Sequence, residues 1–269
     1  MPLNVQIRQV WSYNLAEEFA LIRDAIQQYH FVAMDTEFPG VIFRDQKHYA
    51  DISLAKRYLY LKINVDVLCL IQVGLTLFDA DGNLPTLGVG DDVGYVWEFN
   101  FRDFNLHRHA HSPAAIELLK ASGINFDKNH EQGVDSATFA GFMLSSGLVC
   151  NEVVTWVTFH GAYDFAYLVK ILTSSRLPET LEGFMDLLRF FFGTKVFDAK
   201  MMMRYCDGLY GGLEQVASLL KVNRMVGQSH QAGSDSLLTC QTFLKMKENF
   251  FEEGKEDQYA GVLYGLDNV

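Results

Sequence analysis

Three short segments of this 269-residue chain carry residues that can together perform hydrolytic chemistry. The first contains Asp35 and Glu37, the second Asp164, and the third His230 and Asp235. Four carboxylates carry about four negative charges, which two divalent cations would cancel. A histidine is a suitable general base beside them, because its unperturbed pKa of about 6.5 lies near working pH. If the fold brings the three segments together, these residues predict metal-assisted hydrolysis of an anionic substrate.

The first segment depends on its context, because about four acid-x-acid pairs are expected by chance in a chain of this composition. Asp79 and Asp81 have the same spacing but run into Gly82, where a turn is expected. Asp35 and Glu37 instead lie in a predicted strand over residues 31–38, whose two-residue period puts both carboxylates on one face. Burying two unpaired carboxylates costs several kcal/mol, so this pair requires a compensating cation unless it lies at an exposed strand end.

The other two segments lie at predicted helix starts. Asp164 follows a predicted strand over residues 153–159, where ligands bind in open α/β sheets, although the helix dipole alone also favours an acid in a first turn. His230 and Asp235 would lie about 140° apart within one helix. We therefore expect that helix to begin near Gly233, which leaves His230 on a loop that can turn back toward Asp235. The alternative is a solvent-exposed loop histidine.

The surrounding pattern predicts an α/β fold: one ribonuclease H-like mixed β-sheet with helices on both faces, in a single domain over residues 1–269. Strands over residues 31–38, 68–78 and 95–101 are expected to form an antiparallel meander. A capping box of Asn14 and Glu17 is expected to start a helix that runs to about residue 29. The remaining expected elements are helices over 112–122, 136–144, 163–173, 181–192 and 213–220, and strands over 153–159 and 195–198.

Composition limits the classes of function. With 33 acidic against 22 basic residues the net charge is -11, which excludes binding of duplex nucleic acid by a broad basic surface. The four cysteines have no C-x-x-C spacing, so reduced thiols in core positions are expected. The sequence begins with a polar stretch and has no long apolar run, which favours a cytoplasmic or nuclear protein without a membrane partner.

Residues 31–40 (FVAMDTEFPG), 159–165 (FHGAYDF) and 230–239 (HQAGSDSLLT) resemble the three exonuclease motifs of the histidine-bearing branch of the DEDD superfamily. Across essentially the whole chain the sequence is similar, more narrowly, to the Pop-type deadenylases, the CCR-associated factors that are catalytic subunits of the CCR-NOT complex. The resemblance implies a poly(A)-specific 3′–5′ exoribonuclease that shortens mRNA tails by two-metal-ion hydrolysis and releases 5′-AMP.

By position, the resemblance makes Asp35, Glu37, Asp164 and Asp235 the metal ligands and, with His230 as base, the catalytic set. Hard oxygen ligands favour two Mg²⁺ or Mn²⁺ ions, and the nearby histidine leaves Zn²⁺ as an alternative. The chain departs from the family where Gly161-Ala162 replaces a frequent Ser-Gly, and where residues 46–62 and 85–94 form longer segments.

The resemblance also implies partners: single-stranded poly(A) RNA, the scaffold subunit of the CCR-NOT complex and a leucine-rich-repeat partner deadenylase, with locations in cytoplasm and nucleus. Ile63 and Val67, with Val65 and Leu68 nearby, either dock such a partner or begin the core. Phe38 and Phe165 flank catalytic acids and either stack on RNA bases or pack in the interior.

Overall fold

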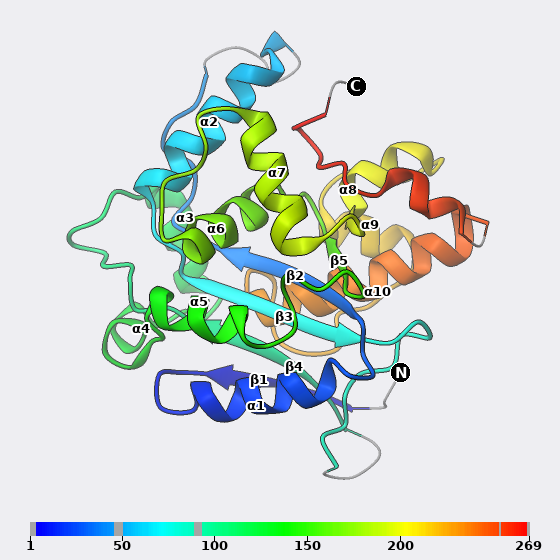
Figure 1. Cartoon of the computed structure of the whole chain (residues 1–269), viewed down its shortest axis with the longest axis horizontal. Coiled ribbons are helices and arrows are strands. Elements are labelled where there is room, and N and C mark those ends of the chain that lie inside the picture. Colours follow the sequence, from blue (N-terminus) through cyan, green and yellow to red (C-terminus); the bar gives the residue numbers. More distant parts are fainter. Residues whose placement is uncertain (1–3, 46–50, 89–92, 253, 268–269) are drawn as a thin grey trace.

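The computed structural model describes residues 4–45, 51–88, 93–252 and 254–267, and its centre is a six-stranded sheet in the order β1-β4-β3-β2-β5-β6 (Figure 1). The strands are β1 (Asn4–Val10), β2 (Phe31–Glu37), β3 (Gln72–Phe78), β4 (Val93–Asn100), β5 (Thr155–Thr158) and β6 (Val196–Asp198). Strands β2, β3 and β4 form the predicted antiparallel meander. Strand β1 is parallel to β4, while β5 and β6 extend the sheet in parallel beyond β2.

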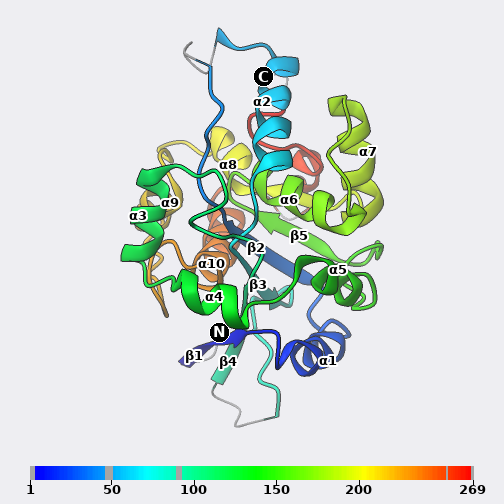
Figure 2. The same ribbon diagram turned by 90° about the vertical axis from the view of Figure 1, so that its left-hand side faces the viewer.

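Helices cover both faces of this sheet. They are α1 (Leu15–Ala25), α2 (Leu54–Val67), α3 (Pro113–Ala121), α4 (Phe126–Gln132), α5 (Ser136–Leu144), α6 (Ala162–Thr173), α7 (Leu181–Phe192), α8 (Ala199–Met202), α9 (Leu213–Leu219) and α10 (Ala232–Phe250). Figure 2 shows α1, α5, α6 and α7 on one side of the strands, and α3, α9 and α10 on the other. The predicted α/β fold, with one mixed sheet between two helical layers, is confirmed.

Two hydrophobic clusters fix the layers. Because side chains alternate along a strand, β2 contributes Val32 and Met34 to the cluster that contains Phe19 of α1 and Phe165 of α6. Its Ala33 faces the second cluster, to which α10 contributes Leu237, Cys240, Phe243 and Met246. Asp35 and Glu37 continue the Ala33 face toward the carboxyl end of the strand. The alternation of β2 therefore directs both carboxylates to the α10 side of the sheet.

Several local predictions were wrong. Strand β1 was not expected, because its polar residues form an edge strand rather than an apolar run. The predicted capping box is absent: Asn14 directs its side-chain oxygen to the backbone N–H of Trp11, and α1 ends at Ala25. The strand expected from residue 68 begins at Gln72, because the preceding residues form the end of α2 and a short loop.

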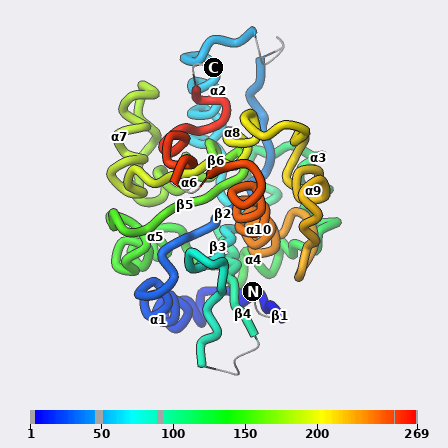
Figure 3. The backbone as a smooth tube through the Cα atoms, turned by 90° about the vertical axis from the view of Figure 1, so that its right-hand side faces the viewer, coloured from blue at the N-terminus to red at the C-terminus, as the bar shows by residue number. Residues whose placement is uncertain are grey.

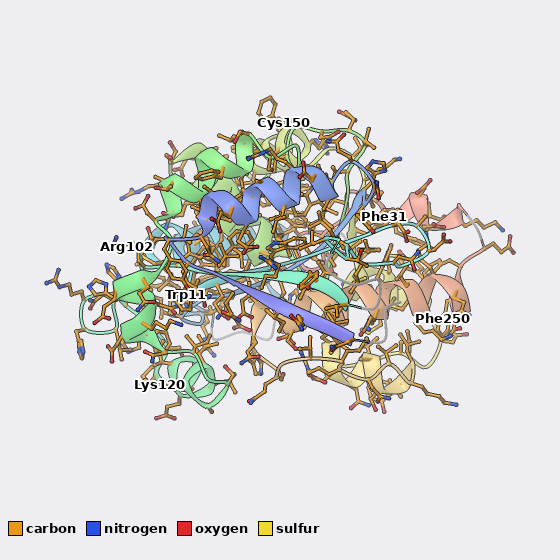
Figure 4. All side chains as sticks on the ribbon, turned by 90° about the horizontal axis from the view of Figure 1, so that it is seen from below. Trp11, Phe31, Arg102, Lys120, Cys150 and Phe250 are labelled. Carbon is orange, nitrogen blue, oxygen red and sulfur yellow. The ribbon has the colours of Figure 1, made fainter. Side chains whose placement is uncertain are left out.

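The thiols are free, as predicted, but only two of them lie in the core. Cys206 and Cys240 are buried, Cys69 is half-buried, and Cys150 is exposed at the periphery of the molecule (Figure 4). Among the described residues, no helix has both the length and the apolar character needed to cross a bilayer.

Candidate active site

The carboxyl end of β2 carries the first two acids, and the backbone around them is tightly packed. Asp35 is paired in register with Gly74 of β3, and Glu37 with Gln72. A Cβ atom at position 74 would lie 1.8 Å from the carbonyl oxygen of Ala232. Only glycine therefore lets the first turn of α10 reach the sheet beside Asp35.

Asp164 lies in the first turn of α6, as predicted, and its side chain turns back to β2. Gly161 ends the approach from β5 and caps the helix, and Asp164 is only 6% exposed. The hydroxyl of Thr36, between the two acids of β2, donates a short hydrogen bond to the Asp164 carboxylate. The second sequence segment is thus bonded directly to the first.

The third segment also folds as predicted. Helix α10 begins at Ala232, so His230 lies on the preceding loop, and its backbone N–H donates to Asp235 Oδ2 at 2.8 Å. The imidazole Nδ1 of His230 lies 4.0 Å from Glu37 Oε1, and 44% of the histidine side chain is exposed. One ligand atom from each of Glu37, His230 and Asp235 lies within 4.8 Å of the others.

The acids repel one another in a buried setting. Burial raises the pKa of Asp35 well above its ordinary value, and the negative charges of Asp235 and Asp164 raise it further. The pKa of Glu37 is raised for the same reasons. Burial raises the pKa of Asp164 to about 7, although the hydrogen bond from Thr36 opposes the shift. At neutral pH the group therefore holds negative charge at a substantial free-energy cost.

This arrangement fits divalent cations. Within the described chain, neither Asp35 nor Glu37 accepts a hydrogen bond on its carboxylate, so their oxygens keep lone pairs for a metal ion. Hard cations such as Mg²⁺ and Mn²⁺ prefer oxygen ligands. The four carboxylates offer the charge and the donor type that such ions need.

Two charged residues that support the site, Arg224 and Glu214, were not predicted from the sequence. Arg224, on the loop before His230, contacts Asp235 Oδ1 at 2.5 Å and also pairs with Glu214 of α9. Its charge opposes the burial that otherwise raises the pKa of Asp235. No spacing rule links residues 214, 224 and 235, because the contact depends on how the loop between α9 and α10 folds.

Asp198, at the end of β6, is a further acid whose role the sequence alone does not reveal. It is fully buried, and its carboxylate accepts hydrogen bonds from the backbone N–H groups of His160, Gly161, Lys200 and Tyr264. Two of these donors belong to the turn that leads into Asp164. The fourth belongs to the C-terminal segment, which runs beside α8 in Figure 3.

The aromatic residues beside the acids pack mainly inside the protein. Phe165 is completely buried in the core. Phe38 is half-buried; it stacks on Tyr163 and makes a tilted contact with Tyr167 of α6, with ring centroids 5.1 Å apart in each case. These contacts favour the packing interpretation over base stacking for both phenylalanines.

Comparison with known proteins agrees with this geometry. The family described as "CAF1 family ribonuclease" matches residues 10–141. A probable CCR4-associated factor 1 homolog 7 of Arabidopsis thaliana is 51% identical over 263 residues, covering 98% of this chain and 94% of the relative. The poly(A) ribonuclease pop2 of Schizosaccharomyces pombe is 42% identical over 260 residues, covering 97% of this chain and 75% of the relative.

Solved structures give the same picture. S. pombe Pop2p in its Mg²⁺- and Mn²⁺-bound form superposes with a TM-score of 0.88 and 42% identity, covering 96% of this chain and 99% of that one. The CAF1 co-crystallized with the yeast NOT1 MIF4G domain gives 0.76 and 30% identity, covering 96% of each chain. Exonuclease I gives 0.54 at 15% identity, covering 85% of this chain and 42% of that one, and shows likeness of fold alone. The predicted ribonuclease H-like architecture is confirmed.

Proposed function

Because the chain belongs to the CAF1 family of ribonucleases, we propose that it is a 3′–5′ exoribonuclease that shortens poly(A) tails and releases 5′-AMP. The observation that carries this proposal is the convergence of Asp35, Glu37, Asp164 and Asp235 from three distant segments into one group of buried or half-buried carboxylates. Unpaired carboxylates destabilise a protein core, but with bound cations they suit a reaction on phosphate.

In this proposal Asp35, Glu37, Asp164 and Asp235 hold two divalent cations. When bound, such cations cancel the carboxylate charge for an anionic phosphodiester, activate water and stabilise the leaving oxygen. Mg²⁺ and Mn²⁺ are supported by the donor set and by their presence in the Pop2p relative. The acids belong to two different helices and one strand, so the fold as a whole fixes their positions relative to one another.

His230 serves as the general base. Its ring is half-exposed and stands near Glu37, so one ring nitrogen can reach a water beside the carboxylates. The neighbouring acid favours the imidazolium that forms after proton transfer. The Thr36 hydroxyl has a different task, since it orients Asp164 through their hydrogen bond.

The proposal is tested with 5′-labelled RNA that ends in an A tail, incubated with the protein and Mg²⁺. We expect a ladder of products shortened from the 3′ end, which disappears when a chelator is added or when Asp35→Ala is used. Asp81→Ala is the matched control, because Asp81 belongs to an acid-x-acid pair in an exposed turn. Internal fragments, or shortening that persists in Asp35→Ala, would refute the assignment.

The relative in the yeast complex is bound to the NOT1 MIF4G domain, which supports binding of the corresponding scaffold by this chain.

We also propose a docking surface for a leucine-rich-repeat partner on α2. Leu59, Ile63 and Val67 follow one another at intervals of four residues and so share one helix face. Leu59 and Val67 are 50% and 53% exposed, while Val65 and Leu68 are fully buried.

This docking surface is tested by the double substitution Ile63→Glu, Val67→Glu in pull-down experiments with the repeat protein. We expect loss of binding with the nuclease rate preserved. Phe190→Glu, at an exposed phenylalanine of α7, is the control for a charge placed on an apolar surface residue. Binding that survives the α2 double substitution would contradict the proposed surface. Wild-type protein that binds partners but shortens no RNA with any divalent ion would instead favour a purely scaffolding role.

A further inference from the structure

The backbone of His230 adopts a conformation that its surroundings must maintain. Its φ angle is +63°, in the left-handed region that residues with a Cβ atom rarely occupy. Such residues persist where neighbouring groups fix them, and they gather at functional sites. The imidazole itself is half-exposed and lies near the carboxylates of Glu37 and Asp235, so the contacts that hold this conformation are made by the backbone.

Both backbone polar groups of His230 are bound by side chains. The N–H donates to Asp235, and the carbonyl oxygen lies 2.9 Å from the hydroxyl of Ser122, at the C-terminal end of α3. That hydroxyl is also 2.8 Å from the carbonyl of Leu119, and it has only one proton to donate. Leu119 has a second donor in the backbone N–H of Ile124, whereas the His230 carbonyl has no other donor in the described chain.

A second hydrogen bond joins the same two segments. The side-chain amide of Gln231 donates to the carbonyl oxygen of Ser122 at 2.8 Å, and its own oxygen accepts from the backbone N–H of Gln228 at 3.0 Å. Ser122 is 5% exposed, so these bonds are shielded from competing water. Residues more than 100 positions apart are thus clasped at the point where the backbone is strained.

Helix α3 is well placed to act as the support. At its start, the backbone N–H of Ser112 donates to the carbonyl of Pro39, on the segment that leaves β2. Gly40 there packs so closely on α3 that a Cβ atom would lie 2.7 Å from the Ala115 Cβ atom. One end of α3 is therefore fixed to the strand that carries Asp35 and Glu37, and the other end to the histidine loop.

We propose that Ser122 is a positioning residue that holds the His230 backbone in its left-handed conformation and so keeps the imidazole over the carboxylates. The inference rests on the proposed function, in which His230 is the base. Loss of the hydroxyl frees the loop to relax toward negative φ, which moves the ring away from the reacting water. The carboxylates and the RNA contacts stay in place, so the turnover rate falls while substrate binding is preserved.

The test compares Ser122→Ala with the wild-type protein on A-tailed RNA at saturating Mg²⁺. We expect kcat to fall about tenfold with KM unchanged, and Ser122→Thr, which keeps the hydroxyl, to restore the rate. Ser146→Ala is the matched control: Ser146 is also buried, and its hydroxyl also bonds to the carbonyl three residues earlier, at the end of α5. An equal loss of kcat in Ser146→Ala would show that general destabilisation causes the effect.

A double-mutant cycle separates positioning from any other role. If Ser122 acts through His230, Ser122→Ala has no further effect on the single-turnover rate of His230→Ala. A tenfold loss in both backgrounds, or a wild-type rate in Ser122→Ala, would overturn the inference.

If Ser122→Ala fails to fold, Gln231→Met provides a second test, because it removes the other hydrogen bond between these two segments. It should lower kcat in the same way, and an unchanged rate in Gln231→Met would contradict the inference. Wild-type protein that shortens no RNA would instead refute the proposed function itself.

Discussion

Two sets of acids, buried or half-buried, lie at the carboxyl ends of parallel strands, and they differ in what balances their charge. Asp198, at the end of β6, accepts four backbone N–H groups. Asp35 and Glu37, at the end of β2, accept no hydrogen bond on their carboxylates within the described residues. The strands end at the same edge of the sheet, where ligands bind in open α/β folds. Position alone therefore does not separate a structural acid from a catalytic one.

The difference lies in the number of protein donors, which is four for Asp198 and none, among the described residues, for Asp35 and Glu37. A carboxylate that receives several N–H groups is stabilised by the fold and organises the backbone around it. Asp35 and Glu37 receive no such donors from the described residues, so their charge requires something added from outside, which the proposed function identifies as divalent cations. Substitutions at the two positions should therefore have opposite signatures in activity and in stability.

The largest effect is expected from Asp35→Asn. This change keeps the side-chain shape but removes one charge from the cluster, so activity on A-tailed RNA should fall by at least about 10³-fold. Without metal, the melting temperature should stay the same or rise, because repulsion with Asp164 and Asp235 decreases. Initial rates and thermal melts in chelator test both expectations. A large loss of stability in Asp35→Asn would show that Asp35, like Asp198, stabilises the fold, and would contradict the proposed difference between them.

Asp198→Asn should show the reverse. An amide offers one acceptor oxygen and places an NH₂ group against backbone N–H donors, so at least two of the four hydrogen bonds are lost. We expect a loss of about 3 kcal/mol in the free energy of unfolding, measured by urea denaturation. Activity should fall less than in Asp35→Asn, through displacement of the turn before Asp164. Asp81→Asn, in an exposed turn, is the control; equal stability for both variants would contradict the structural role.

Metal should stabilise the protein in a pH-dependent way. The folded-state pKa of Asp164 is about 7, well above its ordinary value of 3.8, because of burial. A raised folded pKa means that stability is fully present below about pH 4 and is lost as pH rises toward 7 and above. In chelator the melting temperature should therefore decline over this interval. Mg²⁺ should restore it, with a larger increase at pH 8 than at pH 5; an equal increase at both would show that the acids are not the binding groups.

The sequence was sufficient to predict the site residues that lie at recognisable places in strands and helix starts. The two-residue period of β2 put Asp35 and Glu37 on one face, and the five-residue spacing required a loop at His230. These predictions depend on local periodicity, which the fold preserves. The central meander was predictable for the same reason.

The supporting residues were not predictable, because their roles arise from contacts between distant segments. Asp198 and Arg224 are ordinary charged residues in the sequence, and only the return of the C-terminal segment and of the loop before α10 gives them partners. The polar edge strand β1 and the helix α2 were missed because burial against neighbouring elements, rather than local pattern, determines them.

The smallest effect is expected from Glu98→Gln. Glu98 shares features of both sets of acids, because it accepts hydrogen bonds from the protein, as Asp198 does, and lies near Glu37. Glu98 of β4 is 2% exposed and accepts hydrogen bonds from Gln9, Gln72 and the backbone N–H of Gly233 in the first turn of α10. Burial raises its pKa, and those donors oppose the shift. Since an amide oxygen can still accept from Gly233, we expect a loss of only about 1 kcal/mol in unfolding free energy and an activity within about threefold of wild type.

Glu98→Leu, which has no acceptor at all, should show whether the hydrogen bond or the charge is what matters at this position. It leaves the Gly233 N–H without a partner at the start of the helix that carries Asp235, so both stability and activity should fall further than in Glu98→Gln. If the two variants behave alike, the hydrogen bond has no role, and the negative charge that Glu98 adds near Glu37 is its main contribution. If they differ as expected, Glu98 belongs with Asp198, as an acid whose charge the fold itself satisfies.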